Sequence, residues 1–157
     1  MKPSRPPPRG YTLFEVLIVL VTLSALAAVA LPRLENLGKG ADDVRLASEL
    51  SLIRDAIEHY KVTHEGIHPD HDPAAQLTGR TDPFGTLLPQ EQTDGIGPFL
   101  RRPFPENPVN HLSTIHVVDR LPREADGTSG WIYVRSSGVL RANLPGSASN
   151  GLDYLSL

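Results

Sequence analysis

An apolar run near the N-terminus constrains this chain more than any other feature of its sequence. Residues 16–31 are apolar apart from two hydroxyl side chains. A helix over residues 11–31, rising about 1.5 Å per residue, would extend roughly 30 Å, which is the thickness of a membrane hydrocarbon core. One carboxylate, Glu15, lies inside this segment near its start. Because a charge within a bilayer helix costs at least about 2.5–3.5 kcal/mol, Glu15 is expected to have a function and a partner.

The ten residues before this segment form a basic leader. Residues 1–10 contain lysine and arginine but no acid, and no second long apolar run follows in the chain. This charge pattern predicts a single span with a cytoplasmic N-terminus and an extracytoplasmic C-terminal region. The leader differs from an ordinary secretory signal, because its basic part directly adjoins the apolar run. The alanine-rich residues 25–30 keep a secretory signal open as an alternative.

The junction between leader and apolar run carries a recognisable motif. Residues 9–18 read Arg-Gly-Tyr-Thr-Leu-Phe-Glu-Val-Leu-Ile. This segment resembles the cleavage and methylation site of type IV pilins and of the pseudopilins of type II secretion systems. The family pattern is a basic leader ending in glycine, then usually Phe-Thr-Leu-x-Glu, then an apolar run. This chain differs in one place, with Tyr11 where phenylalanine is usual.

The resemblance implies a role for three residues. A prepilin peptidase would cleave after Gly10, and Tyr11 would become the N-methylated amino terminus. Glu15 would pair with the Tyr11 amine of a neighbouring subunit during assembly, which neutralises two charges that are costly in a low dielectric. The alternative is that the Glu15 carboxylate merely reaches the cytoplasmic interface.

The resemblance also implies where the protein acts and with which partners. It would be a structural subunit rather than an enzyme, held first in the inner membrane and then assembled into a periplasmic or cell-surface filament. Its partners would be identical or related pilin-like subunits, the prepilin peptidase and an inner-membrane assembly platform. The chain has no cysteine. Many major type IV pilins close a C-terminal loop with a disulfide, so this absence favours a pseudopilin or a minor pilin.

Pro32 directly follows the apolar run and predicts a break in the helix. Proline removes one backbone hydrogen bond and clashes with the preceding helical turn. One interpretation is a simple bend where the chain leaves the membrane. The other is a flexible point that lets the membrane segment repack in a filament. The sequence leaves both interpretations open.

An amphipathic pattern continues the helix beyond the apolar run. Apolar residues recur at spacings of three and four, which places them on one helical face. This predicted stripe consists of Leu46, Leu50, Ile53, Ile57 and Tyr60. Gly66 and Pro69 predict where the helix stops. We therefore expect one long helix from about residue 11 to residue 64, whose second half packs on a globular head. Gly38 and Gly40 weaken the join between its halves, so an interruption near residues 32–41 stays open.

Strand signals appear only in the last third of the chain. Residues 114–118, 131–135 and 139–144 are rich in β-branched, aromatic or alternating apolar residues, and the last two segments predict an antiparallel hairpin. Trp131, Tyr133 and Leu140 are expected to pack on the helix stripe. The prolines between residues 66 and 113 exclude long regular elements there.

These patterns predict an α+β fold of pilin-like organisation, with a long N-terminal helix packed by its second half on a small antiparallel sheet. The predicted parts are a cleaved leader at residues 1–10 and a transmembrane or filament-core helix at residues 11–31. The amphipathic continuation covers residues 32–65. Residues 66–157 form a loop-rich head with a β-hairpin.

Metal binding is the main alternative chemistry that the sequence suggests. His64, His68 and His71 have side chains that zinc can bind, but their spacing matches no strong motif, and a solvated acidic loop is the favoured interpretation. Asn150 and Asp153 offer too few oxygens to predict a calcium site in the C-terminal loop. No metal or other cofactor is therefore expected.

Other functional classes are disfavoured by the sequence. We find no nucleophile elbow, phosphate-binding loop or metal-hydrolase helix. The formal net charge of −3, which becomes more negative when the leader is removed, argues against general nucleic-acid binding. The alternative to a pilin-like subunit is an uncleaved, membrane-anchored binding module whose function lies in the extracytoplasmic head.

Overall fold

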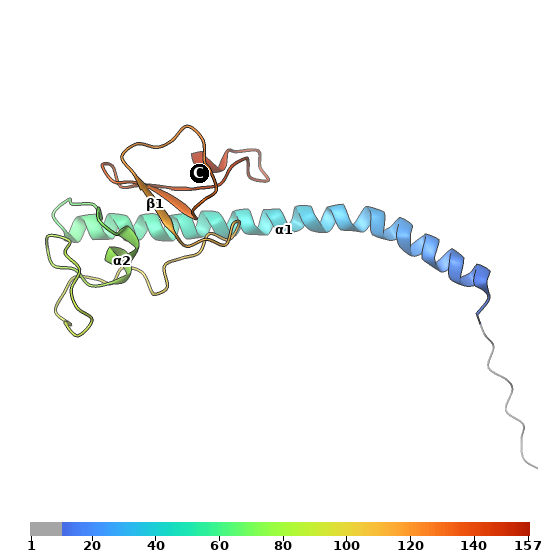
Figure 1. Ribbon diagram of the computed structural model, residues 1–157, viewed down its shortest axis with the longest axis horizontal. Helices are drawn as coiled ribbons and strands as arrows, with labels where there is room; N and C mark the ends of the chain where they lie inside the picture. Colours follow the sequence, from blue (N-terminus) through green and yellow to red (C-terminus); the bar gives the residue numbers. More distant parts are fainter. Residues whose placement is uncertain (1–10) are drawn as a thin grey trace, which may run out of the picture. The chain divides into compact units, whose positions relative to one another are not determined.

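The computed structural model describes residues 11–157, with only the backbone described for residues 30–39. The chain divides into two compact units, Met1–Gly38 and Lys39–Leu157. A single long helix, α1 (Leu13–Thr63), begins in the first unit and is the first element of the second (Figure 1). The expectation of one long N-terminal helix is therefore confirmed.

The second half of α1 is helical because its apolar stripe is buried in the head. The five predicted stripe residues are at most 2% exposed, and Ala56 is buried beside them. All of them belong to one hydrophobic core with residues of the sheet and of the loops. Tertiary burial of one face is what normally stabilises an amphipathic helix, so the predicted stripe is confirmed both in position and in role.

The end of α1 also follows the predicted signals. The helix stops at Thr63, and the next two positions with left-handed backbone are Glu65 and Gly66. The Gly66 amide donates a hydrogen bond to the Lys61 carbonyl at 2.8 Å, which satisfies a carbonyl of the last helical turn. The chain can therefore reverse into the loop that follows.

Three strands form one small sheet in the order β1-β2-β3. They are β1 (Ile115–Val118), β2 (Trp131–Val134) and β3 (Val139–Ala142). β2 and β3 pair antiparallel, with Tyr133 opposite Leu140, so the predicted hairpin is confirmed. β1 pairs parallel with β2, with Ile115 opposite Trp131. The sheet is therefore mixed, and the expectation of an antiparallel sheet is wrong for β1.

The connection between β1 and β2 explains this difference. Residues 119–130 join the two strands. An antiparallel pair can be joined by a tight turn, whereas a parallel pair needs a connection of about a dozen residues to return to the same end of the sheet. Gly130 ends this connection at a point where an added Cβ would lie 1.9 Å from the Leu112 carbonyl oxygen. Only glycine fits at that close approach.

The central strand joins the core of the head. Trp131 and Tyr133 are fully buried in the same core as the α1 stripe and Leu140, as expected. Ile132 and Val134 point to the opposite face and are also buried. Figure 1 shows α1 on one side of the sheet and connecting loops on the other. Both faces of β2 are therefore covered, which explains why all four of its residues are buried.

A short helix in the loop region was not expected. α2 (Pro73–Thr78) is capped at its start by Asp72, whose carboxylate accepts a hydrogen bond from the Ala75 amide at 3.0 Å. Aspartate before the helix and proline at its first position are both favourable start signals. α2 places Gln76 and Leu77 in the interior of the head.

The C-terminal segment is attached to α1 by polar contacts. The Asp43 carboxylate accepts hydrogen bonds from the Tyr154 hydroxyl at 2.7 Å and from the Ser149 amide at 2.6 Å. Arg54 donates to the Leu140 carbonyl at 2.8 Å and also to the Leu157 carbonyl. Two side chains of α1 therefore hold the segment that follows β3.

The buried stripe predicts a difference between two adjacent residues of α1. Ile53 is fully buried, whereas Leu52 is 50% exposed. We expect Ile53→Ala to lower the free energy of unfolding by about 2–5 kcal/mol because it removes buried methyl groups and leaves a cavity. The matched Leu52→Ala change should cost less than about 1 kcal/mol. Denaturation followed by the fluorescence of Trp131, the sole tryptophan, measures both. Equal losses would contradict this packing.

The attachment at Asp43 predicts a pH dependence. Burial acts to raise the pKa of Asp43, but hydrogen bonds from Ser149 and Tyr154 bring the pKa below its ordinary value. A carboxylate with a depressed pKa stabilises the fold above its unfolded pKa of about 3.9, and this contribution is lost as the pH falls through the folded pKa. Asp43→Asn should therefore be less stable than the wild type at pH 7, and the difference should shrink on acidification.

The neighbouring Asp42→Asn variant is the matched control for this prediction. Asp42 makes no hydrogen bond to the C-terminal segment among the described contacts, whereas Asp43 makes two. Urea unfolding of the wild type and both variants between pH 2 and pH 7 compares the free energies of unfolding. A difference for Asp43→Asn that does not depend on pH would contradict the assigned role of this carboxylate.

Candidate assembly site

The start of α1 is organised by a side-chain cap at Thr12. The Thr12 hydroxyl oxygen accepts a hydrogen bond from the Glu15 amide at 3.2 Å, and the Thr12 carbonyl accepts one from the Val16 amide at 3.2 Å. Threonine at this position satisfies an amide that has no partner within the helix. Glu15 then occupies the third helical position, where a negative charge interacts favourably with the helix dipole.

The side chains of the predicted assembly motif are accessible. Tyr11 and Glu15 are both exposed, and no residue in the described part of the chain forms an ion pair with Glu15. The third residue of the motif, Gly10, lies outside the described residues. The Glu15 carboxylate is therefore available to a group from another molecule, while its own amide is held by Thr12.

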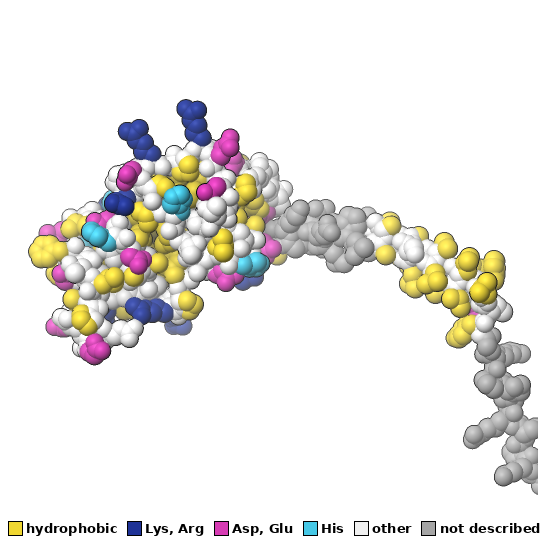
Figure 2. All heavy atoms as spheres, in the orientation of Figure 1, with side chains coloured by type: hydrophobic (Ala, Val, Ile, Leu, Met, Phe, Trp, Pro, Cys, Tyr) yellow, Lys and Arg dark blue, Asp and Glu magenta, His cyan; other side chains and the backbone are white. Residues whose placement is uncertain are grey.

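An apolar surface covers the first part of α1. Every residue from 11 to 29 is exposed, and the large hydrophobic side chains among them are between 47% and 88% exposed. Figure 2 shows hydrophobic side chains gathered on this part of the helix. A helix that is apolar on all sides is normally buried, because it has no polar face to present to water.

Within residues 16–29, the two hydroxyl residues bond to their own helix. Thr22 donates to the Val19 carbonyl at 2.9 Å, and Ser24 donates to the Leu20 carbonyl at 2.7 Å. Their polar atoms therefore need no partner from outside the helix, which makes the segment compatible with an apolar environment.

Two sequence predictions for this region, the membrane span and the helix break at Pro32, are not confirmed. Among the described residues, we find no helix with a stretch long and apolar enough to cross a membrane, so a membrane-spanning first half of α1 is not confirmed. The helix break expected at Pro32 falls in residues 30–39, whose side chains lie outside the described part of the structure. The backbone assignment of α1 includes this segment.

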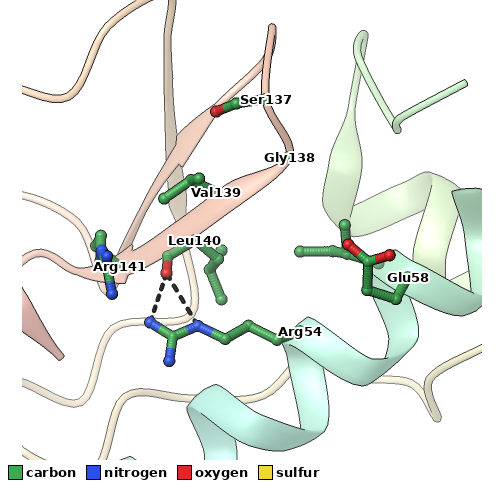
Figure 3. Close-up of a pocket in the computed structure, with 8 residues that line it drawn as sticks. Arg54, Glu58, Ser137, Gly138, Val139, Leu140 and Arg141 are labelled. Atoms are coloured by element: carbon green, nitrogen blue, oxygen red, sulfur yellow. Dashed lines mark hydrogen bonds between the residues drawn. The ribbon is translucent and has the colours of Figure 1, made fainter.

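The head has a cleft between α1 and the β-hairpin (Figure 3). It has a volume of about 240 Å³ and includes Arg54 and Glu58 of α1 and Arg141 of β3. Figure 3 shows the Arg54 side chain reaching from α1 to the Leu140 carbonyl. Burial lowers the pKa of Arg54, and the nearby charge of Arg141 lowers it further.

Both arginines of this cleft hold main-chain groups. Arg54 and Arg141 each donate to the Leu157 carbonyl, the latter at 2.8 Å. Their hydrogen bonds join α1, β3 and the C-terminal segment, which makes their role structural. Ser137 and Glu58 also line the cleft, but no hydrogen bond between the hydroxyl and the carboxylate occurs among the described contacts, so they do not form an activated pair in this structure.

The three histidines considered as metal ligands lie in different environments. His64 is fully buried, and its ring nitrogens lie 2.8 Å from the Tyr60 carbonyl and 2.8 Å from the Thr81 hydroxyl. The expectation of a solvated loop is therefore wrong for His64, because the reversal after α1 turns its ring into the core. His71 is exposed and contacts Asp70 at 2.6 Å, whereas His68 packs beneath Gly138.

Among the residues that the structure describes, we find no group of three or more histidine, cysteine, aspartate or glutamate side chains that could hold a metal ion. The two residues considered for calcium instead serve as local caps. Asn150 accepts a hydrogen bond from the Leu152 amide at 3.0 Å, and Asp153 accepts one from the Leu155 amide at 2.8 Å. Asp153 thereby starts the short 3₁₀ helix η1 (Tyr154–Ser156).

Sequence reasoning missed several residues that organise the molecule. Thr12 could have been found, because a threonine three residues before a glutamate is a known helix-start signature. Asp43 and Arg54 carry no such signal, since they resemble ordinary polar residues on the outer face of a helix. Only the position of the C-terminal segment shows that they are attachment points.

Comparison with known proteins relates the chain to one group. A type II secretion system core protein G from Klebsiella pneumoniae is 35% identical over 94 residues, which cover 53% of this chain and 67% of that protein. The protein of the same name from Aeromonas hydrophila is 25% identical over 99 residues, covering 63% of this chain and 66% of that protein. The one from Escherichia coli strain K12 is 29% identical over 66 residues, or 46% of its length.

The match to the first two relatives thus spans about two thirds of their length. No protein-family model matches the chain, and no solved structure matches it. The level of identity to the Klebsiella protein over two thirds of its length establishes the relationship. The chain belongs to the type II secretion system core protein G family.

Proposed function

We propose that this chain is a pilin-like structural subunit of a type II secretion pseudopilus. A prepilin peptidase cleaves it after Gly10, and Tyr11 becomes a methylated amino terminus. Residues 11–31 hold the subunit in the inner membrane with its head outside, until an assembly platform transfers it to the filament. There the same helix packs against those of neighbouring subunits. The family relationship and the leader motif support this proposal.

The observation that carries the proposal is the exposed apolar surface of residues 11–29. An extended apolar surface of this kind marks a site of interaction with a membrane or a protein. The hydroxyl groups of Thr22 and Ser24 are already satisfied, so lipid and neighbouring helices are both suitable environments. Because lipid tails are as apolar as the helix, packing of the small residues near Ala27 and pairing of Glu15 must favour the filament over the membrane.

The geometry at the start of α1 supports the assigned role of Glu15. Its carboxylate is exposed and unpaired within the described part of the chain, and α1 begins only two residues after Tyr11. A neighbouring subunit displaced along the filament could bring its Tyr11 amine to this carboxylate. Such a pair sets the axial position of one subunit relative to the next, because both charges are otherwise unfavourable among apolar helices.

The first test is mass spectrometry of the N-terminus of the protein purified from cells. We expect a chain that begins at Tyr11 and carries one additional methyl group on its amine. A Gly10→Leu variant, which disrupts the cleavage motif, should retain residues 1–10 and stay out of filaments. An intact leader on the wild-type protein in cells would contradict processing and would favour a membrane-anchored binding module.

The second test separates the charge of Glu15 from its helix-start position. Glutamine is also suitable at the third position of a capped helix, so Glu15→Gln keeps the cap and removes the charge. We expect this variant to reduce the amount of subunit in sheared filaments at least tenfold. Thr12→Val removes the cap, at about 1 kcal/mol of helix stability, but keeps the charge, so it should assemble better than Glu15→Gln.

Glu91→Gln, an exposed carboxylate of the head, is the matched control for loss of one charge. Immunoblots of the filament and membrane fractions compare the variants at equal subunit levels. Normal incorporation of Glu15→Gln, together with poor incorporation of Thr12→Val, would show that this region acts through helix capping and would overturn the pairing proposal.

A further inference from the structure

A second cleft lies in the head, on the loops that follow α1. It has a volume of about 270 Å³, and its lining comes from two loops, one with Asp70 and His71 and one with Phe84, Thr86 and Leu87. Gln76 and Gly85 complete its lining. None of these residues belongs to the assembly motif of α1.

Phe84 is exposed although the turn that carries it is firmly held. Its side chain is 81% exposed. The Asp82 carboxylate accepts hydrogen bonds from the Phe84 amide at 2.9 Å and from the Thr86 amide at 2.8 Å. Gly85 has a φ of +84°, and an added Cβ would lie 2.5 Å from the Tyr60 hydroxyl oxygen. A rigid turn that presents a large aromatic side chain to solvent is a typical anchor for a binding partner.

The buried side-chain amide of Gln76 joins the two loops that line the cleft. Gln76 is 2% exposed, and its nitrogen donates to the Gly85 carbonyl at 2.8 Å. Its oxygen accepts a hydrogen bond from the Asp70 amide at 3.0 Å. The distance between the aromatic side and the acidic side is therefore set by a single side chain of the core. Such a fixed geometry lowers the entropic cost of binding.

The charges around the cleft are predominantly negative. Burial raises the pKa of Tyr60, at the base of this region, to about 12, and the charges of Asp70 and Asp82 contribute to that increase. Asp70 itself lines the cleft, and the Asp82 carboxylate lies beside it, on the amides of the lining residues Phe84 and Thr86. His71, the one basic side chain that lines it, is directed to Asp70 at 2.6 Å. This arrangement disfavours an anionic ligand and favours a cation.

We propose that this cleft binds a lysine or arginine side chain of a partner protein. The aliphatic stem of that side chain packs against Phe84 and Leu87, and its cationic end meets Asp70. A cation beside an aromatic face and a carboxylate gains from both interactions. The cleft accommodates one long side chain, and its exposed aromatic rim is suited to a flanking peptide backbone. This binding role goes beyond filament assembly through α1.

The full-length protein in detergent micelles, labelled with ¹⁵N at phenylalanine and glycine, provides the test. The chain has four phenylalanines. Phe84 and Gly85 report on the cleft, and the buried Phe104 and Gly130 report on the core. We expect the capped tripeptide Gly-Arg-Gly to shift the Phe84 and Gly85 signals saturably and to leave Phe104 and Gly130 unchanged. The same peptide with neutral citrulline in place of arginine should bind at least fivefold more weakly.

Two variants assign the binding to the cleft. Phe84→Ala and Asp70→Asn should each weaken arginine-peptide binding at least fivefold, as read from Gly85. Leu121→Ala, which removes an exposed apolar side chain elsewhere on the head, should leave binding unchanged. Unaltered Phe104 and Gly130 signals establish that each variant is folded.

Three outcomes would overturn the proposal. The first is a shift that does not saturate, and the second is equal binding of the arginine and citrulline peptides. The third is binding of free arginine without binding of the capped peptide, which would exclude a protein segment as the ligand. None of these results depends on filament assembly, so a failure of this proposal is distinguishable from a failure of the proposed subunit role.

Discussion

Burial of one face of α1 against β2 is the contact on which the rest of the head depends. The stripe from Leu46 to Tyr60 and the strand residues Trp131 and Tyr133 are almost completely removed from water. At about 25 cal/mol per Å² of apolar surface, such contacts supply the main driving force for folding. The polar contacts of Asp43, Gln76 and Arg54 hold loops and the C-terminal segment around this core.

The two parts of α1 differ because their apolar residues are distributed differently. From residue 46 to residue 60 they follow one face, so the head alone can bury them. From residue 11 to residue 29 they surround the helix, and the structure leaves all of them exposed. One helix therefore combines a segment that stabilises its own domain with a segment whose apolar surface requires other molecules. This division agrees with the proposed transfer of the subunit from the membrane to a filament.

The loops between α1 and the sheet depend on buried polar groups rather than on regular structure. His64 contacts Thr81, and Gln76 contacts both the Asp70 and Gly85 backbones. Prolines interrupt regular strands, so backbone pairing in these loops is limited to isolated bridges such as Thr81 with Ile96, and side chains of the core satisfy further backbone groups. Hydrogen bonds from Gln76 and to Asp82 hold the exposed Phe84 turn in the same way, although it lies in a segment without strands.

The sequence by itself determined the elements whose signals are local. Periodic apolar spacing located the buried face of α1, alternating residues located the β2–β3 hairpin, and the residues around Gly10 and Glu15 indicated the family. Only the tertiary structure decided that β1 pairs parallel with β2, that His64 is buried and that Asp43 holds the C-terminal segment. The physical reason is that these contacts join residues far apart in the chain, and their partners are chosen by how loops return to the core.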